Sequence, residues 1–305
     1  MIALLAPGQG SQAPGMLEPW LALPGAPERV AAWSAAADLD LARLGTTATA
    51  EEITDTAVTQ PLVVALALLA YEELERRGEL PSEVLTAGHS VGELAAAAIA
   101  GVFSPDDAVA LAAVRGAAMG AACAAEATGM AAVLGGDAAE VTARLDELGL
   151  VPANQNAKGQ VVAAGLLTAL DALEADPPAK ARIRRLSVAG AFHTPYMASA
   201  QDAVAERVAA ITPHDPVRPL LSNADGQVVH SGQDVLRRLV TQVTNPVRWD
   251  ACMATMAELG ATALVELPPS GALVGMAKRE LRGTPTLALK TPDDLAALTA
   301  LAVTQ

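Results

Sequence analysis

The chain is poor in aromatic residues and in cysteine. Only 2% of its 305 residues are Phe, Trp or Tyr although 52% are hydrophobic, so alanine, leucine and valine must fill the core. Side chains of this kind bury enough apolar area for a packed globular protein. Cys123 and Cys252 lie in alanine-rich segments with helical character. This context predicts buried thiols rather than a disulfide or a metal site.

Long apolar runs and an excess of positive charge are also absent. The longest apolar runs, such as residues 61–71, are too short to span a bilayer. No cationic segment precedes the apolar N-terminal run, so we expect no signal peptide. The net charge of −14 argues against nucleic-acid binding, which needs a basic surface. We therefore expect a cytoplasmic protein with neither a nucleic-acid nor a membrane partner.

Two basic segments nevertheless interrupt this acidic chain. The first contains Lys180, Arg182, Arg184 and Arg185, and the second contains Lys278 and Arg279. Segments of this kind are often ordinary solvated faces of a strand or helix. They are equally suited to dock an acidic partner or phosphate groups, and the sequence leaves both interpretations open.

Strand-like and helix-like segments alternate along the chain, which predicts an α/β fold. We predict strands at residues 2–6 and 84–87, and helices at residues 63–76, 93–100 and 104–125. Between residues 128 and 188 the order strand–helix–hairpin–helix–strand is ferredoxin-like (βαββαβ). We therefore predict a large α/β-hydrolase-like domain with a central parallel sheet, at residues 1–127 and 190–305. A small ferredoxin-like subdomain at residues 128–189 would be inserted in it.

The most informative motif is GHSVG at residues 88–92, directly after the apolar run at residues 84–87. The pattern G-x-S-x-G is typical of a nucleophile elbow, in which serine occupies a strained turn between a strand and a helix. Glycines two residues either side let the backbone turn without Cβ clashes. Ser90 is then exposed beside the free N–H groups of a helix N-terminus, which suits a nucleophile that forms an acyl intermediate.

A serine nucleophile needs a base, and the chain has four histidines. His89 should point to the opposite side of the elbow from Ser90, while His214 and His230 lie in loop-like segments. His193 follows the proposed subdomain and precedes the next helix, so it is the best candidate base. Because no acid stands out at a suitable strand end, we predict a Ser–His dyad in which a main-chain carbonyl orients His193.

Two further features have competing interpretations. Residues 7–13 (PGQGSQA) look like a dinucleotide-binding turn, but Pro14 and Pro19 fall where its helix should begin. A turn that supplies an oxyanion-hole N–H is the better interpretation. Arg115 lies on an apolar helical stripe with no acid three or four residues away. Either a distant acid or solvent satisfies Arg115, or its planar guanidinium binds a substrate carboxylate.

Together these motifs resemble the malonyl-CoA:acyl-carrier-protein transacylases of bacterial fatty-acid synthesis, particularly those of high-GC actinobacteria. The matching segments are PGQGSQ at 7–12, TQP at 59–61, GHSVGE at 88–93, RG at 115–116, NQN at 154–156, GQ at 159–160, GAFH at 190–193 and NPVRW at 245–249. The resemblance covers nearly the whole chain. This set of spacings is far more specific than an isolated G-x-S-x-G motif.

The resemblance implies a role for each matched residue. Ser90 would be the acylated nucleophile and His193 its base. The backbone N–H groups of Gln9 and Val91 would form the oxyanion hole, and Arg115 would hold the malonyl carboxylate.

The resemblance also implies residues around the substrate. Gln60 would line the pocket, Asn156 would lie near the pantetheine path, and the main-chain carbonyl of Arg248 would orient His193. In related polyketide acyltransferases, an aliphatic residue after the serine and an A-F-H sequence accompany malonyl use. Phe192 fits that pattern, because its ring would crowd an α-methyl group. This crowding would give about 1–3 kcal/mol of discrimination against methylmalonyl.

The reaction that the resemblance implies is ping-pong transfer of a malonyl group from malonyl-CoA, through Ser90, to the phosphopantetheine thiol of an acyl carrier protein. This chemistry needs no metal or redox cofactor, and we expect a monomer. The carrier is acidic, so both basic segments become docking candidates. The alternatives are an acyltransferase that serves a polyketide synthase in trans, a serine esterase, and an inactive carrier-binding scaffold.

Overall fold

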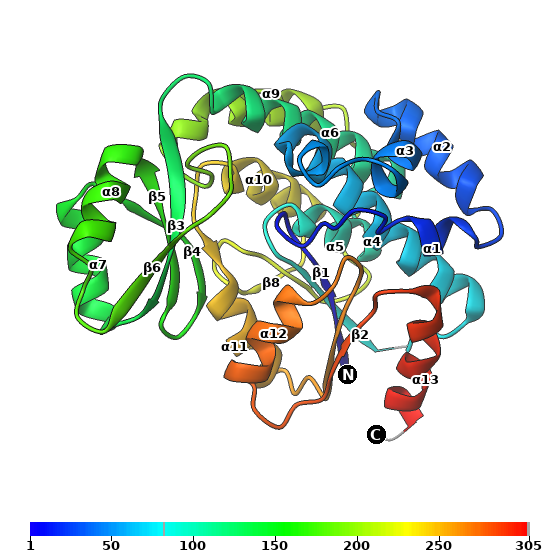
Figure 1. Cartoon of the computed structure of the whole chain (residues 1–305). Helices are drawn as coiled ribbons and strands as arrows, with labels where there is room; N and C mark the ends of the chain where they lie inside the picture. The colour runs from blue at the N-terminus through cyan, green and yellow to red at the C-terminus, as the bar shows by residue number, and fades with distance from the viewer. Residues whose placement is uncertain (82, 304–305) are drawn as a thin grey trace.

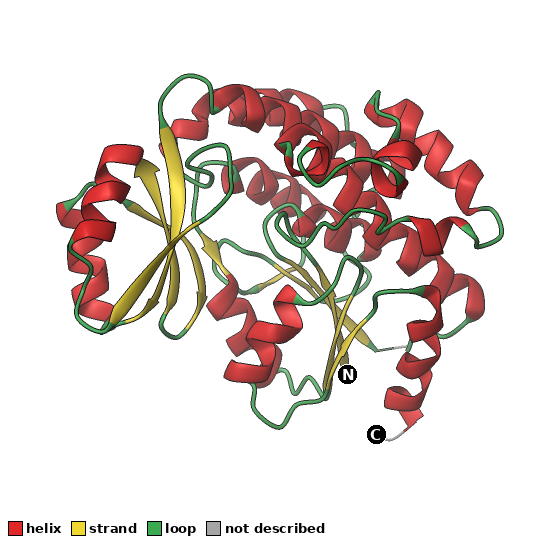
Figure 2. Ribbon diagram, viewed as in Figure 1, coloured by secondary structure: helices red, strands yellow, loops and turns green. Residues whose placement is uncertain are grey.

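Two β-sheets organise the computed structural model, which describes residues 1–81 and 83–303. The result is a mixed α/β fold with two lobes, one around each sheet (Figure 1 and Figure 2). The large sheet has the strand order β11 (Thr286–Ala288), β10 (Ala263–Glu266), β1 (Ile2–Ala6), β2 (Val84–Gly88), β7 (Leu220–Leu221) and β8 (Val228–Val229). Its pairings are parallel except that of β7 with β8.

Strands β1 and β2 are buried on both faces, which explains why apolar residues dominate both and Thr86 is the one polar residue among them. One face, which includes Ile2 and Leu4, belongs to the same core as α4 (Thr56–Arg77), α5 (Gly92–Ile99) and α6 (Pro105–Ala122). The opposite face, which includes Ala3 and Leu5, packs with α11 (Trp249–Glu258) and α12 (Ala272–Glu280). Both strands end at the same edge of the sheet, where ligands bind in open parallel sheets.

The remaining helices complete the large lobe. They are α1 (Glu18–Leu21), α2 (Ala26–Ala37), α3 (Leu41–Thr46), η1 (Glu52–Thr54), η2 (Pro195–Met197), α9 (Ala198–Val208), α10 (Gly232–Gln242), η3 (Pro292–Asp294) and α13 (Leu295–Val303). Among them, α10 bears directly on the site, because its last residue lies next to the histidine described below.

The second sheet forms the smaller lobe. Its strand order is β6 (Ala181–Arg185), β3 (Thr128–Gly135), β5 (Gln160–Leu166), β4 (Val151–Ala157) and β9 (Val247–Arg248). The helices α7 (Ala138–Glu147) and α8 (Leu167–Ala175) pack on one face of this sheet, which is the outer face in Figure 1. Strand β9 comes from outside residues 128–189 and pairs with β4 in parallel, so the two parts of the chain share this sheet.

The elements between residues 128 and 188 occur in the order that the sequence predicts. Helix α4 differs from its prediction, because it begins at Thr56 rather than after Pro61. The Asp55 carboxylate caps this helix by accepting the Ala57 N–H at 2.9 Å, and Pro61 is accommodated inside it. Proline usually marks a helix boundary, which is why the sequence pattern places the start too late.

The length of α4 corrects the expectation that the apolar runs are too short for a bilayer. By length and composition alone, this helix is long and apolar enough to cross a membrane. Its most apolar window is 78% buried within the fold, as expected for the core helix of a globular lobe.

Candidate active site

Ser90 lies at the sharp turn between β2 and α5, in the left-handed conformation with φ +54°. The flanking glycines are needed because the backbones approach closely. A Cβ on Gly88 would lie 2.1 Å from the backbone of Gly92, and a Cβ on Gly92 would lie 2.3 Å from the Ala6 carbonyl oxygen. The G-x-S-x-G spacing therefore lets the elbow pack against the end of β1 with its serine held in a strained conformation.

His193 faces this serine. Its Nε2 lies 2.7 Å from Ser90 Oγ, and its Nδ1 lies 2.8 Å from the main-chain carbonyl oxygen of Gln242. A carbonyl only accepts hydrogen bonds, so Nδ1 carries the proton and Nε2 accepts from the serine hydroxyl. Burial, followed by the charge of Arg115, lowers the pKa of His193 to about 3. The imidazole is therefore neutral at pH 7 and can receive a proton.

The carbonyl that orients His193 corrects one prediction, because it belongs to Gln242 at the end of α10 and not to Arg248. The Arg248 guanidinium instead pairs with Asp250 at 3.0 Å. The Arg248 backbone N–H donates to the Asn223 carbonyl, which holds β9 beside the elbow. The sequence motif thus points to the correct neighbourhood but to a residue six positions too late.

Arg115 is buried beside Ser90, with 2% of its surface exposed. One guanidinium nitrogen, Nη1, donates to Gln60 Oε1 at 2.7 Å. The other, Nη2, donates to Gln242 Oε1 at 2.9 Å and lies 3.3 Å from Ser90 Oγ. Burial lowers the pKa of Arg115 to about 10, opposed by the charge of Glu93. Arg115 therefore remains a cation at pH 7 and is held by two neutral amide oxygens.

The backbone N–H groups of Gln9 and Val91 flank the serine. Val91 caps the N-terminus of α5, and Gln9 follows β1 in the turn that packs on the elbow. Within residues 1–81 and 83–303, neither N–H has a hydrogen-bond partner. Two free donors beside a nucleophile are what an oxyanion hole requires.

A cavity of about 160 Å³ opens onto the Ser–His pair. It is lined by Gln9, Gln60, His89, Ser90, Met119, Met130, Asn154, Asn156, Val162, Leu186, Val188, Phe192 and His193. The large lobe supplies Ser90 and His193, and β3, β4 and β5 of the smaller lobe supply the facing wall. The site thus lies where the two lobes meet.

The position of His89 differs from the expectation that it points away from the serine, because it also lines this cavity. Its Nε2 lies 2.9 Å from the Asn156 amide oxygen, and its ring meets Trp249 edge to face at 5.6 Å. Burial lowers the pKa of His89, so it is neutral and donates from Nε2. His89 therefore joins the elbow to β4 and orients the Asn156 amide.

The strand β6 divides the first basic segment between its two faces. Arg182 and Arg184 are exposed, and so is Lys180 in the turn before them. Arg184 and Val162 both pair with Ala132 of β3, so they lie on the same face of the sheet. Since Val162 lines the cavity, two arginines of this segment face the same side as the site.

Arg185 points to the opposite face, where it forms ion pairs with acids of α8, among them Glu174 at 3.2 Å. In the second basic segment, Arg279 is exposed on α12 beside Lys278, and its guanidinium donates to Gln160 Oε1 at 2.8 Å. Arg279 therefore contacts the smaller lobe, whereas Arg185 is already neutralised by its neighbours.

Sequence reasoning missed three residues of the site: Glu93, Asn223 and Gln242. Asn223 accepts the Ser90 N–H through Oδ1 at 2.7 Å, and Glu93 accepts the Asn223 N–H at 2.9 Å. One signal could have found Glu93, since a carboxylate in the alanine-rich run ELAAAAIA has no route to water and must find partners. Asn223 and Gln242 lie in distant segments, and no local pattern marks them.

Comparisons with known proteins agree with this geometry. A family model described as an acyl transferase domain matches residues 4–293. The chain is 64% identical over 296 residues to the malonyl CoA-acyl carrier protein transacylase of Mycobacterium tuberculosis, covering 97% of this chain and 98% of that protein.

Solved structures show the same similarity. The crystal structure of MCAT from Mycobacterium tuberculosis matches with a TM-score of 0.97 and 64% identity, covering 98% of this chain and 99% of that one. A malonyl-transacylase in complex with a type II PKS acyl-carrier protein matches with a TM-score of 0.90 and 31% identity, covering 98% of this chain and 99% of that one.

Proposed function

The chain belongs to the acyl transferase domain family, and we propose that it transfers a malonyl group from malonyl-CoA to the phosphopantetheine thiol of an acyl carrier protein. The transfer passes through a malonyl ester of Ser90 and supplies fatty-acid synthesis. The observation that carries this function is the Arg115 guanidinium, which lies 3.3 Å from the nucleophilic Ser90 Oγ. A buried cation at that distance suits an acyl group that itself bears a carboxylate.

In the first half-reaction, Ser90 Oγ attacks the thioester carbonyl of malonyl-CoA while His193 Nε2 takes the hydroxyl proton. The carbonyl oxygen becomes an oxyanion, which accepts hydrogen bonds from the backbone N–H groups of Gln9 and Val91. The carbon–sulfur bond then breaks, and the proton on His193 passes to the departing sulfur. Coenzyme A leaves as the free thiol, and malonyl-Ser90 remains.

In the second half-reaction, the carrier's phosphopantetheine thiol gives its proton to His193 and attacks malonyl-Ser90. Collapse of the second oxyanion breaks the serine ester, and the proton returns to Ser90 Oγ. Throughout, the carbonyl of Gln242 keeps Nδ1 protonated and aims Nε2 at the reacting atoms. Because every step uses these side chains and backbone groups, we propose that the enzyme needs no cofactor beyond its thioester substrate.

Three residues shape the acyl pocket. The malonyl carboxylate pairs with the side of the Arg115 guanidinium that faces Ser90, while the amide oxygens of Gln60 and Gln242 keep the guanidinium in place. Gln60 then remains as the pocket wall beside the acyl group. Phe192 is buried at 6% exposure and lines the cavity, so it excludes an α-methyl group and favours malonyl over methylmalonyl.

The carrier arm reaches the serine between the lobes. Val188 lines both the cavity and a larger groove of about 870 Å³ bordered by η1 and α6, so the cavity and the groove adjoin one another. The Asn156 amide faces the cavity beside His89 and is suited to hydrogen-bond the pantetheine chain. Arg182, Arg184 and the exposed residues of α12 are the docking candidates for an acidic carrier.

We further propose the finer description of the fold. Residues 128–189 form a ferredoxin-like subdomain, supported by the strand order β6-β3-β5-β4 with antiparallel pairing. Residues 1–127 and 190–305 form the hydrolase-like domain, supported by the parallel sheet and the elbow. Two free thiols and the burial of α4 support a cytoplasmic location, and we propose that the enzyme is a monomer.

Intact mass spectrometry tests the proposed function. Mixing with malonyl-CoA should add one malonyl group, mapped to Ser90, and later addition of phosphopantetheinylated carrier protein should remove it and load the carrier. S90A is the control and should gain no adduct. Hydrolysis to free malonate without carrier loading would favour an esterase, and no adduct at all would favour an inactive scaffold. Comparing fatty-acid with polyketide carriers distinguishes the trans-acting alternative.

A further inference from the structure

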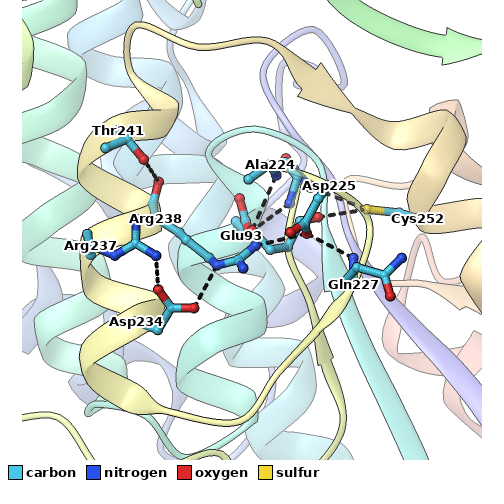
Figure 3. A network of polar contacts seen from close by, with 11 residues as sticks. Glu93, Ala224, Asp225, Gln227, Asp234, Arg237, Arg238, Thr241 and Cys252 are labelled. Carbon is cyan, nitrogen blue, oxygen red and sulfur yellow. Dashed lines mark hydrogen bonds and ion pairs between the residues drawn. The ribbon is translucent and has the colours of Figure 1, made fainter.

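Glu93 is a buried carboxylate that the reaction steps above do not use. It follows Ser90 by three residues on α5 and is 5% exposed. In Figure 3 it lies between α10, which carries Arg238, and the loop that carries Ala224 and Asp225. Arg238 and Asp225 form an ion pair of 2.8 Å, which joins the helix and the loop to each other.

One oxygen of Glu93 holds the loop that supports the nucleophile. Oε1 accepts the Asn223 backbone N–H at 2.9 Å. The Asn223 side chain in turn accepts the Ser90 N–H at 2.7 Å and donates to the Gly88 carbonyl at 2.8 Å. These bonds fix both sides of the strained serine, which would otherwise relax from its left-handed conformation.

The other oxygen of Glu93 accepts from the Gln242 side-chain nitrogen, Nε2. Nε2 also donates to the Ser90 carbonyl at 3.1 Å, while Oε1 of the same amide accepts from Arg115. An ionised carboxylate only accepts, so a flipped amide would put oxygen against Glu93 and N–H groups against Arg115. The charge of Glu93 therefore selects the amide orientation that holds Arg115.

Gln242 also carries the carbonyl that holds His193 Nδ1. Hydrogen bonds thus link the two oxygens of Glu93 to Ser90, His193 and Arg115, and only two residues, Asn223 and Gln242, lie between them. We propose that Glu93 is a positioning residue for malonyl transfer, whose ionised carboxylate holds Ser90, His193 and Arg115 in their relative positions. This inference rests on the proposed function, because it assigns to Glu93 the support of that same reaction.

The charge state of Glu93 should therefore appear in the pH dependence of acylation. Burial raises the pKa of Glu93 to about 7, opposed by its hydrogen bonds and by the charge of Arg115. The titratable groups that face it are Arg115 from α6, Cys252 from α11 and, through Gln242, His193. Burial raises the pKa of the Cys252 thiol, and His193 and Arg115 titrate near 3 and 10. Among these described groups, Glu93 alone changes charge between pH 6 and 8.

The test measures the single-turnover rate of Ser90 malonylation from pH 5.5 to 8.5 by quenched-flow mass spectrometry. In the wild type, the rate should rise about tenfold between pH 6 and pH 8, as expected for one essential ionisation near pH 7. E93Q should be about tenfold slower than the wild type at pH 8 and should show no such rise. E93D, which keeps the charge on a shorter side chain, should recover the pH dependence.

E266Q is the matched control. Glu266 is another buried carboxylate, and it accepts N–H groups at the start of α12, including those of Gly271 at 2.9 Å and Val274 at 2.9 Å. Its loss should lower stability while the pH profile of acylation stays as in the wild type.

Three outcomes would overturn the role of Glu93: a flat wild-type profile near pH 7, an E93Q profile that keeps the rise, or an E266Q profile that loses it. A flat wild-type profile would overturn the role even if E93Q fails to fold, and in that case E93D supplies the comparison for a profile that rises. A wild-type enzyme that forms no malonyl-Ser90 at any pH would instead overturn the proposed function itself. The two failures are therefore distinguishable.

Discussion

Ser90 and His193, the two residues that we propose react, both have left-handed backbones, with φ +54° and φ +61°. Such a conformation costs a residue other than glycine about 1–2 kcal/mol, so neighbouring contacts must enforce it. For Ser90 these contacts are the Asn223 side chain and the two close-packed glycines. Stability is thus given up locally to hold the serine oxygen and the histidine nitrogen at hydrogen-bond distance.

Arg115 is the residue that we propose sets the choice of acyl group. R115A should lower the rate of Ser90 malonylation by about a hundredfold, since a charge-assisted pair with the malonyl carboxylate is lost. Acetylation should be unchanged or faster, because an acetyl group has no carboxylate and leaves the buried cation without a partner. Competition between malonyl-CoA and acetyl-CoA, followed by intact mass, measures the ratio. R144A, on α7 in the other lobe, is the matched control and should keep wild-type selectivity. An unchanged ratio of malonylation to acetylation in R115A would show that Arg115 does not bind the malonyl carboxylate.

The raised pKa of Glu93 also predicts how the free energy of unfolding depends on pH. Its pKa of about 7 in the folded protein exceeds its usual 4.5, so the folded state binds the proton more tightly than the unfolded state. Its contribution is complete below pH 4.5 and is lost as the pH rises through 7, which costs about 3 kcal/mol. E93Q avoids this cost. Urea titrations at pH 5 and pH 8 should show E93Q gaining about that much relative to the wild type at the higher pH. If the difference stays constant, Glu93 is not a perturbed acid.

At the scale of the element, strand alternation decides which basic residues can meet a carrier. Residues of one strand point to opposite faces in turn, so a basic run cannot act as one patch. Arg182 and Arg184 lie on the face of the sheet that lines the cavity, whereas Arg185 forms ion pairs with acids of α8 on the other face. The sequence run of basic residues hides this division, which becomes clear only once β6 pairs with β3.

The corresponding prediction concerns the double variant R182E/R184E. Reversed charge on this face should raise the KM for carrier protein about tenfold, because it repels an acidic partner. Acylation by malonyl-CoA should be unaffected. R185E is the matched control and should change neither half-reaction strongly, since it lies on the other face. Steady-state kinetics with each substrate varied separately gives both KM values. Equal effects on the two half-reactions would argue against docking at β6.

Local patterns in the sequence predict most elements but fewer of the contacts in the site. The strands at 2–6 and 84–87 are found because buried parallel strands read as apolar runs, and α6 because Ser104 and Pro105 mark its start. Ser90, His193 and Arg115 each stand out through a local motif or an unusual burial pattern. Gln242 does not, because its role depends on how α10 docks on the elbow. The wrong choice of Arg248 has the same cause.

On the scale of the whole molecule, malonylation adds negative charge to a chain that already carries a net charge of −14. Added like charge generally destabilises a compact state through self-repulsion. Here the new carboxylate lies beside a buried guanidinium whose present partners are neutral amides. A direct buried ion pair outweighs the distant, solvent-screened repulsion of surface carboxylates. The local interaction should therefore determine the sign of the effect.

Thermal unfolding of the isolated malonyl-enzyme tests this balance. The malonylated wild type should melt about 1–2 °C above the free enzyme, as a gain of about 1 kcal/mol would give in a chain of this size. Acetylated enzyme lacks the second carboxylate and should melt close to the free enzyme. In R115A the malonyl adduct should give no gain, because the added charge then has no buried partner. Should malonylation lower the melting temperature equally in both proteins, net charge would dominate, and Arg115 would not be the group that receives the malonyl carboxylate.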